Sequence, residues 1–399
     1  MTDVLELARE LIRTPSPVVD GDERAVAALM ADVLTDAGLP RPTVHALDPT
    51  RPNLLTTLDF GAGGAHLVLC GHLDTKPVGD AAWSADPFGA DLDGDRLYGL
   101  GSGDMKAGVA AMTVAAERLA EEPPRCGRLS LLLTADEENG AVYGSQFLGR
   151  AVELAADGMV IGEPGGIAED FDRLHVSSRG LARFDVLASA RQGHSSLSSV
   201  LGMRNAGADV AAAVTRLHGA ELVTPLAPPG VRDWNATVNA GLAYRGGWGY
   251  GVLPDHVSAL VEVRTLPGMT PGAVLAELTE RAREGADGAD VEVRPDATAA
   301  HWIDASPLVP ADGALVRAAE AAGAAVLGHR PPTSVFPGTT DASWLAGLGT
   351  PCLPALGPGL LARAHGADEW VSVRAVHQAA DLYEQLARAF CAPTAGEPR

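Results

Sequence analysis

Three short apolar runs in the first 165 residues each end in acidic or imidazole side chains. The runs and their polar ends are 66–71 with His72 and Asp74, 129–135 with Asp136, Glu137 and Glu138, and 159–162 with Glu163. Short apolar runs of this kind indicate buried strands, and an open α/β sheet binds its ligands beyond the carboxyl ends of its strands. Carboxylate and imidazole groups at several such ends predict a metal-centred active site.

The size and charge of the chain limit the functions it can have. Its 399 residues, 46% of them hydrophobic, suffice for a large core and predict two domains. The net charge of -21 and the sequence pI near 4.8 argue against nucleic-acid and anionic-membrane partners, because both need a positive protein surface. No segment reaches the ~18 consecutive apolar residues of a membrane helix, and the N-terminal residues do not resemble a signal peptide. We therefore expect a cytoplasmic protein.

Other chemistries find little support in the sequence. The four cysteines, at positions 70, 126, 352 and 391, include no Cys-x-x-Cys pair, so neither a zinc ribbon nor a disulfide framework is indicated. There is no Gly-x-Ser-x-Gly motif and no histidine beside a cysteine, which disfavours a covalent nucleophile. The glycine-rich turn 99–103 lacks the Gly-Lys-Ser/Thr ending of a phosphate-binding loop, which leaves nucleotide binding as a minor alternative.

The order of predicted elements indicates one domain inserted into another. Strands and helices first alternate as in a mostly parallel sheet covered by helices, with helices at 2–13, 22–38 and 105–121 and strands at 53–58, 66–71 and 129–135. From about residue 176 the pattern becomes β-α-β-β-α-β, the ferredoxin-like order, with elements at 182–188, 204–218, 237–243, 257–265, 270–285 and 289–294. We expect a catalytic domain formed by 1–175 and 299–399, and an inserted α+β domain at 176–298.

Two acidic features fit a pair of metal ions better than a single ion. Asp104 follows a glycine-rich segment at a predicted helix start, and its two oxygens could bridge two cations about 3.5–4 Å apart that activate one shared water. An N-cap aspartate is the alternative, and the two interpretations are compatible. Glu137 and Glu138 are adjacent, so one can coordinate while the other acts as a general base. A solvated acidic turn, and a surface turn at His72 and Asp74, remain the alternatives.

Taken together, these motifs resemble those of the M20-type metallopeptidases and deacylases, which include acetylornithine deacetylase, succinyl-diaminopimelate desuccinylase, aminoacylase and carboxypeptidase G. The resemblance covers nearly the whole chain and rests on the segments 71–75, 97–106, 134–138, 161–164, 193–196, 264–270 and 357–359, followed by His365. It implies a zinc exopeptidase-like catalytic domain, with a mostly parallel mixed sheet sandwiched by helices, and an inserted domain that serves as a lid and in dimerisation. The set is much less specific for a substrate than for the family.

The resemblance also implies roles for individual residues. It implies two divalent metal ions, zinc being the first expectation and cobalt a substitute in vitro. The ligands it implies are His72 and Glu163 for one ion, Glu138 and His365 for the other, and Asp104 as the bridge. Asp74 would orient His72, Glu137 would be the general base, and the peptide bond after Asp104 would be cis. His365 is implied by the resemblance alone.

Residues that contact the substrate are also implied. His194, on the inserted domain, resembles an oxyanion-stabilising histidine that the partner subunit of a homodimer often supplies; a surface histidine is the alternative. The resemblance implies a receptor for a substrate carboxylate made of Arg264, Gly338, Thr339 and Thr340. Arg264 could equally be a salt-bridged strand residue.

The residues of these motifs are most similar to those of acetylornithine deacetylase. We therefore expect hydrolysis of an N-acyl amino acid, with an N-acetyl amino acid as the first choice. Gly251 stands where family members often have Asn, and Thr340 where Ser is usual, and both departures concern the substrate. A dipeptidase, a carboxypeptidase and a succinyl-diaminopimelate desuccinylase are alternatives within the class. A metal-binding protein without turnover is an alternative outside it.

Overall fold

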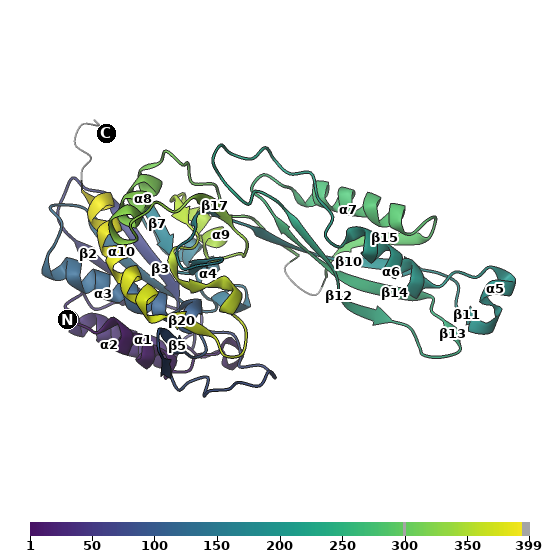
Figure 1. Cartoon of the computed structure of the whole chain (residues 1–399), viewed down its shortest axis with the longest axis horizontal. Helices are drawn as coiled ribbons and strands as arrows, with labels where there is room; N and C mark the ends of the chain where they lie inside the picture. Colours follow the sequence, from purple (N-terminus) through teal and green to yellow (C-terminus); the bar gives the residue numbers. More distant parts are fainter. Residues whose placement is uncertain (298–300, 393–399) are drawn as a thin grey trace.

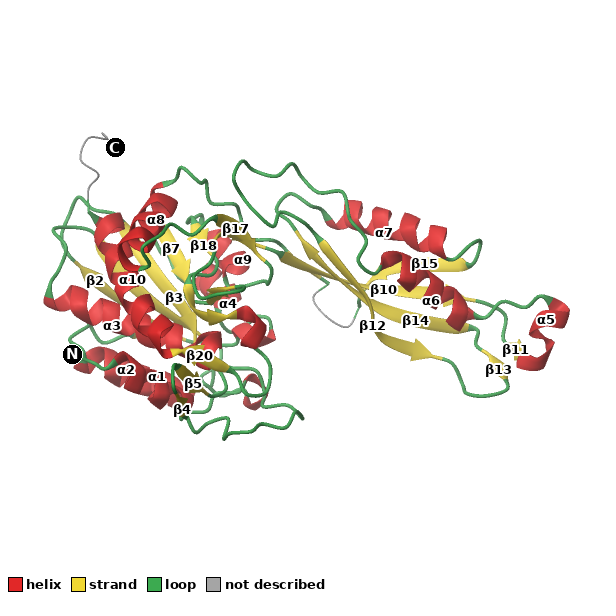
Figure 2. Cartoon of the chain, in the orientation of Figure 1, coloured by secondary structure: helices red, strands yellow, loops and turns green. Residues whose placement is uncertain are grey.

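A computed structural model describes residues 1–297 and 301–392, which form two lobes (Figure 1). The compact lobe holds a six-stranded sheet and the N-terminus, and the elongated lobe holds a five-stranded sheet (Figure 2). The expected boundary at 298/299 lies outside the described residues, and strand β9 (Leu174–Ser178) runs across the expected boundary at 176. The division into 1–175, 176–298 and 299–399 therefore stays a prediction.

The sheet of the compact lobe is mixed, with three of its five strand pairs parallel. Its strands, in spatial order, are β1 (Thr43–His45), β2 (Asn53–Asp59), β6 (Arg128–Thr134), β3 (His66–His72), β7 (Gly158–Ile161) and β18 (Cys352–Leu353). All seven residues of β3 and all four of β7 are buried, as expected for strands whose two faces are both covered. The predicted mostly parallel mixed sheet is confirmed.

The three central strands place the chemistry of the sequence at one edge of this sheet. β6, β3 and β7 are neighbours and run parallel, with His72 paired to Thr134 and Cys70 paired to Ile161. Parallel strands end at the same edge of a sheet, so the polar residues behind each of them converge there.

The helices of the compact lobe surround this sheet and share one hydrophobic core with it. They are α1 (Val4–Ile12), α2 (Arg24–Asp36), α3 (Ala107–Glu121), α4 (Ser145–Ala151), α8 (Ala314–Val326), α9 (Ala342–Leu345) and α10 (Val373–Cys391). α3 and α10 pack against each other, and both contact β3 and β6. Helix α1 begins at Asp3, whose carboxylate accepts the N–H groups of Leu5 and Glu6 as an N-cap. Within the described residues, none of the helices is both long and apolar enough to cross a bilayer.

The elongated lobe has the predicted β-α-β-β-α-β order. Its elements are β10 (Gly180–Ser189), α6 (Ala206–Leu217), β12 (Thr237–Gly246), β14 (His256–Thr265), α7 (Pro271–Gly285) and β15 (Asp290–Pro295). The strands form an antiparallel sheet in the order β12, β14, β10, β15, and β16 (Trp302–Ile303) also pairs with β10. α6 and α7 pack on each other over a second core, and Thr270 caps α7 with Pro271 in its first turn, as the sequence predicts.

Shorter elements complete the lobes. In the compact lobe β5 (Arg96–Tyr98) pairs with both β4 (Leu92–Asp93) and β20 (Trp370–Ser372). In addition, β8 (Pro164–Gly166) pairs with β19 (Gly357–Leu360), and β9 pairs with β17 (Thr333–Phe336). It also has the helical turns η1 (Val18–Asp20), η2 (Ser102–Lys106), η3 (Glu137–Asn139), η5 (Ala346–Leu348) and η6 (Leu361–Arg363). The far tip of the elongated lobe has β11 (Gly193–His194) paired with β13 (Val252–Leu253), next to η4 (Ser195–Leu197) and α5 (Ser198–Leu201) (Figure 1).

Candidate active site

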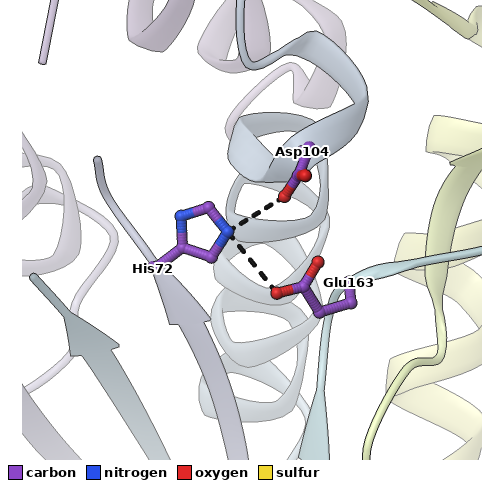
Figure 3. Close-up of side chains that lie close together, drawn as sticks. All are labelled: His72, Asp104 and Glu163. Carbon is purple, nitrogen blue, oxygen red and sulfur yellow. Dashed lines mark hydrogen bonds and ion pairs between the residues drawn. The ribbon is translucent and has the colours of Figure 1, made fainter. Parts of the chain in front are cut away.

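Five side chains at the edge of the large sheet form two groups that share Asp104. In the first group, His72 Nε2 lies 3.0 Å from Asp104 Oδ1 and 3.5 Å from Glu163 Oε1 (Figure 3). In the second group, His365 Nε2 lies 3.1 Å from Asp104 Oδ2 and 3.2 Å from Glu138 Oε2. Asp104 thus turns one oxygen toward each histidine, which is the arrangement a bridging carboxylate requires.

Each of these side chains comes from the end of an element fixed by the core. His72 is the last residue of β3, Glu138 lies in the turn η3 behind β6, and Glu163 directly follows the residue after β7. Strand β8 continues from Glu163 and pairs with β19, with Gly357 opposite Pro164. This pairing brings the segment that carries His365 to the same edge, although it lies some two hundred residues further along the chain.

A buried glutamate holds the turn that carries Asp104. Glu369, 2% exposed, accepts the N–H groups of Gly103 and Asp104 at Oε1, at 2.9 and 3.1 Å, and that of Gly101 at Oε2, at 3.0 Å. The peptide bond from Asp104 to Met105 is cis, as the resemblance implies. The turn leads straight into α3, so its position depends on both the core and Glu369.

Asp74 lies behind the first group and connects two of the strand ends. Its backbone carbonyl accepts a hydrogen bond from His72 Nδ1 at 2.9 Å, whereas its carboxylate Oδ1 lies 3.8 Å from that nitrogen. The carboxylate instead accepts the N–H groups of Glu137 and Glu138, at 3.1 and 3.0 Å. The His72 ring is therefore oriented by the main chain of Asp74, and the side chain of Asp74 fixes the turn that bears the two glutamates.

Asp136, the first acid behind β6, points away from the two groups. Its carboxylate forms an ion pair with Arg51 at 2.8 Å and accepts the N–H of Tyr143, and Arg51 also pairs with Glu23 at 2.5 Å. All three members of this ion triad are buried. With φ at 64°, Asp136 also makes the sharp bend that turns the chain into η3. It shapes the turn and takes no part in the groups.

The electrostatics of the two groups show an excess of negative charge. Burial raises the pKa of Glu163 to about 8 and that of Asp74 to about 7, and it raises the pKa of Glu137 well above its ordinary value. Hydrogen bonds to Asp104 and Glu138 raise the pKa of His365 to about 10. Protons on imidazoles and carboxylates thus offset a surplus of buried acids, a task that bound cations would take over.

The donor atoms fit divalent metal ions. Each group offers one imidazole nitrogen and two carboxylate oxygens within 4.8 Å of one another, a set suited to zinc and similar ions. Glu138 Oε1 is buried without a hydrogen-bond partner, so this carboxylate has a further oxygen free for a cation. The open sides of the groups face a cavity, where further ligand positions remain for water or substrate.

The cavity in front of the groups has a volume of about 470 Å³ and lies between the two lobes. The wall on the side of the compact lobe includes the second group, Glu137 and Glu163, and the segment from Phe336 to Thr339. The other wall belongs to the elongated lobe, whose lining residues are Thr237, Asn239, Glu262 and Arg264. The substrate-binding residues Gly338, Thr339 and Arg264 predicted from the sequence therefore all reach this cavity.

Two arginines lie on the cavity wall, and the sequence indicated only one of them. Arg264 pairs with Glu262 at 2.9 Å and donates to the Thr339 hydroxyl at 3.3 Å. Arg179, 7% exposed, donates through Nη2 to Asn235 at 2.6 Å and to the Asp233 carbonyl, while its Nε has no hydrogen-bond partner. A buried guanidinium with a free donor beside a cavity is suited to an anionic ligand.

Strand alternation could have indicated some of the further residues around the site, but not all of them. Glu262 and Arg264 lie two apart on β14 and face Asn239 and Thr237 on β12, so strand alternation puts all four on one face. No pattern singles out Arg179. Lys76, which forms an ion pair with Glu138 at 3.0 Å, was also missed, although it stands only two residues after Asp74.

The structure does not bring Thr340 and His194 to the cavity of the same chain. Thr340 is buried, and its hydroxyl accepts the N–H of Ala342 at the start of α9. His194 is the last residue of β11, which lies at the far tip of the elongated lobe (Figure 1). Its side chain is exposed, and its Nδ1 lies 2.8 Å from the Ser196 hydroxyl.

Comparison with known proteins shows the family of the chain. A sequence profile described as peptidase family M20/M25/M40 matches residues 68–389. The chain belongs to this family. Succinyl-diaminopimelate desuccinylase of Rhizorhabdus wittichii is 31% identical, with 98% of this chain and 99% of the relative aligned, and that of Stenotrophomonas maltophilia is 31% identical over 97% and 98%. As a member of the M20 family, the protein is a metal-dependent hydrolase that acts on amide bonds.

Solved structures show the same fold. An M20 family metallo-carboxypeptidase from Sulfolobus solfataricus superposes with a TM-score of 0.73 at 18% identity, covering 98% of this chain and 99% of that one. A dinuclear metal-binding peptidase of the M20 family from Bacillus subtilis superposes with a TM-score of 0.64 at 17% identity, covering 96% of each chain. The fold is therefore shared with these structures over nearly the whole chain.

Proposed function

We propose that the protein is a dimetal amidohydrolase that cleaves the amide bond of an N-acyl amino acid and releases a carboxylic acid and a free amine. The observation that carries the proposal is the pair of ligand groups sharing Asp104 beside a cavity that Glu137 also lines. His72 and Glu163 would hold one ion, Glu138 and His365 the other, with Asp104 between them. When bound, two divalent cations, zinc by first expectation, would polarise the amide carbonyl and activate water.

Glu137 is proposed as the general base. It begins the turn η3 behind β6, lines the cavity, and its backbone N–H is held by the Asp74 carboxylate, so its position is fixed relative to the two groups. A carboxylate here would take a proton from the attacking water as the new C–O bond forms. The same proton would then pass to the amide nitrogen as the C–N bond breaks, which releases the amine and leaves Glu137 ionised again.

Two guanidinium groups on one cavity favour an acyl group that carries its own carboxylate. Arg264 is already paired with Glu262, while Arg179 keeps a free, buried Nε. The carboxylate of an amino acid needs one cationic partner, and a succinyl group adds a second carboxylate that an acetyl group lacks. Together with the desuccinylase relatives, this favours an N-succinyl amino acid, the alternative, over the N-acetyl substrate of the first expectation.

His194 would act from a second copy of the chain. It is exposed at the lobe tip, away from the cavity of its own chain, and its segment belongs to the lobe proposed for dimerisation. In a homodimer formed through the elongated lobes, the imidazole of one subunit would stabilise the oxyanion in the cavity of the other. A donor of this kind typically contributes ~10²–10³ in rate.

Hydrolysis of a substrate panel tests the proposal. The protein loaded with zinc or cobalt is assayed on N-succinyl-diaminopimelate, N-acetylornithine, N-acetylmethionine and simple dipeptides. We expect turnover, with the succinylated substrate preferred. In Arg179→Met, kcat/KM for that substrate should fall more than for the acetylated ones, by about 2 kcal/mol or more in transition-state binding. Inactivity on the whole panel would support the metal-binding protein without turnover instead.

A further inference from the structure

Lysine is almost absent from this chain, and both of its lysines lie beside the two ligand groups. Of the 30 basic residues, 28 are arginines, and the two lysines are Lys76 and Lys106. Lys106 is buried two residues after Asp104 and donates to the carbonyl groups of Leu11 and Thr14, so it serves the fold. Lys76 is one-third exposed, and its contacts are with Glu138 instead. Its location therefore needs a separate explanation.

Lys76 contacts the atom through which Glu138 joins the second group. Its Nζ lies 3.0 Å from Glu138 Oε2, and the same oxygen lies 3.2 Å from His365 Nε2. Nζ also donates to the Glu138 backbone carbonyl, which holds the ammonium over the turn. A cation bound at Oε2 and an ammonium at hydrogen-bond distance from the same oxygen would share one negative charge.

The first group has no comparable contact. The ion pairs of Asp104 and Glu163 in the described part of the chain are with His72 and His365. The side chains of the first group are almost fully buried, at 1%, 8% and 6% exposure, whereas in the second group Glu138 is 5% exposed but His365 is 49% exposed. A charge acts more strongly where solvent is excluded, so the two groups differ in both field and access.

We infer that the Lys76 ammonium is a tethered competitor of the second metal ion, so that the second group binds its ion more weakly than the first and is filled after it. The inference rests on the ligand assignment proposed above. Lys76 cancels the charge that Glu138 contributes, and it repels a divalent cation placed at Oε2. Because Lys76 is partly exposed and Glu138 Oε1 lacks a partner, the ammonium can move to water or to Oε1 when the ion binds.

Calorimetric titration of the metal-free protein with zinc tests the inference. We expect two binding steps in the wild type, and in Lys76→Met a second step tightened by ~10–100-fold with the first step unchanged, the range typical for groups that contact a ligand residue. Lys76→Gln serves as a second neutral variant, and Lys76→Arg should keep the weak second step. Arg118→Met is the matched control, because Arg118 is 31% exposed and pairs with carboxylates on α10.

Amine labelling gives a second readout that does not depend on activity. Because Lys106 is buried, a brief pulse of acetic anhydride should modify Lys76 as the one accessible lysine side chain, and mass spectrometry measures its extent. Labelling of Lys76 should rise between one and two equivalents of zinc.

The outcomes separate the two proposals. Two ions bound with the same second Kd in the wild type and in Lys76→Met would overturn the role of Lys76 and leave the proposed function standing. A wild type that binds no zinc would overturn the ligand assignment itself.

Discussion

The Glu369 carboxylate gives the sharpest prediction about how the fold positions the site. Its three hydrogen bonds fix the turn of Gly101, Gly103 and Asp104, and Asp104 is the residue that both ligand groups share. In Glu369→Gln, an amide NH₂ group replaces one oxygen and leaves at least one backbone N–H without an acceptor, at a cost of about 1–3 kcal/mol. Glu369→Ala removes the acceptors for all three and should cost more.

In Glu369→Gln the turn that carries Asp104 should shift while the rest of the chain stays folded. We therefore expect Glu369→Gln to bind zinc ~10–100-fold more weakly, as is typical when a residue that orients a ligand is changed. Zinc titration and urea unfolding measure the two effects. The control is Glu117→Gln, because Glu117 is a buried carboxylate on α3 that accepts the Thr2 N–H and has no contact with the ligand groups. Wild-type zinc affinity in Glu369→Gln would refute the reasoning.

Three further predictions concern stability and assembly. Arg51→Met leaves the carboxylates of Glu23 and Asp136 buried without their cation and should destabilise the compact lobe by about 3–5 kcal/mol in urea unfolding, and an unchanged midpoint would refute it. Burial lowers the pKa of His175 to about 4, so between pH 6.5 and 4 this histidine takes up a proton in the unfolded chain but not in the folded chain. The free energy of unfolding should therefore fall by about 3 kcal/mol through this group as the pH drops from 6.5 to 4. In His175→Gln this part of the pH dependence should be lost. Mixing inactive Glu137→Gln with inactive His194→Ala should restore about a quarter of wild-type activity if His194 acts from the partner subunit, and none if it acts within its own chain.

The sequence predicts much of the site because three neighbouring strands end in the acidic and imidazole residues proposed as metal ligands. Each apolar run is a buried strand, and the polar residues at its carboxyl end mark the edge of the sheet where ligands bind. His72, Glu163 and the Glu137–Glu138 pair follow from this rule once β3, β6 and β7 are neighbours, whereas the choice of Glu138 as the ligand of that pair came from the family resemblance. The order of the strands in the sheet, however, cannot be predicted from the sequence of any single strand.

The remaining site residues depend on contacts between distant segments. His365 reaches the site through the pairing of β19 with β8, and only the family resemblance indicated it. Arg179 lies where the chain passes between the lobes, and its role depends on a cavity that neither lobe forms alone. The sequence predicts that the Asp74 carboxylate orients His72, whereas in the structure the Asp74 backbone carbonyl contacts the ring and the carboxylate holds the turn of Glu137 and Glu138.

The most direct test of the proposed chemistry is the pair of measurements on Glu137→Gln: bound zinc per chain and turnover of the preferred substrate. Glu137 belongs to neither ligand group, so the variant should bind two zinc ions as the wild type does. Without a carboxylate to take the proton from water, kcat should fall by ~10²–10⁴. Turnover at the wild-type rate, or loss of the bound zinc, would contradict the assignment of Glu137 as the base.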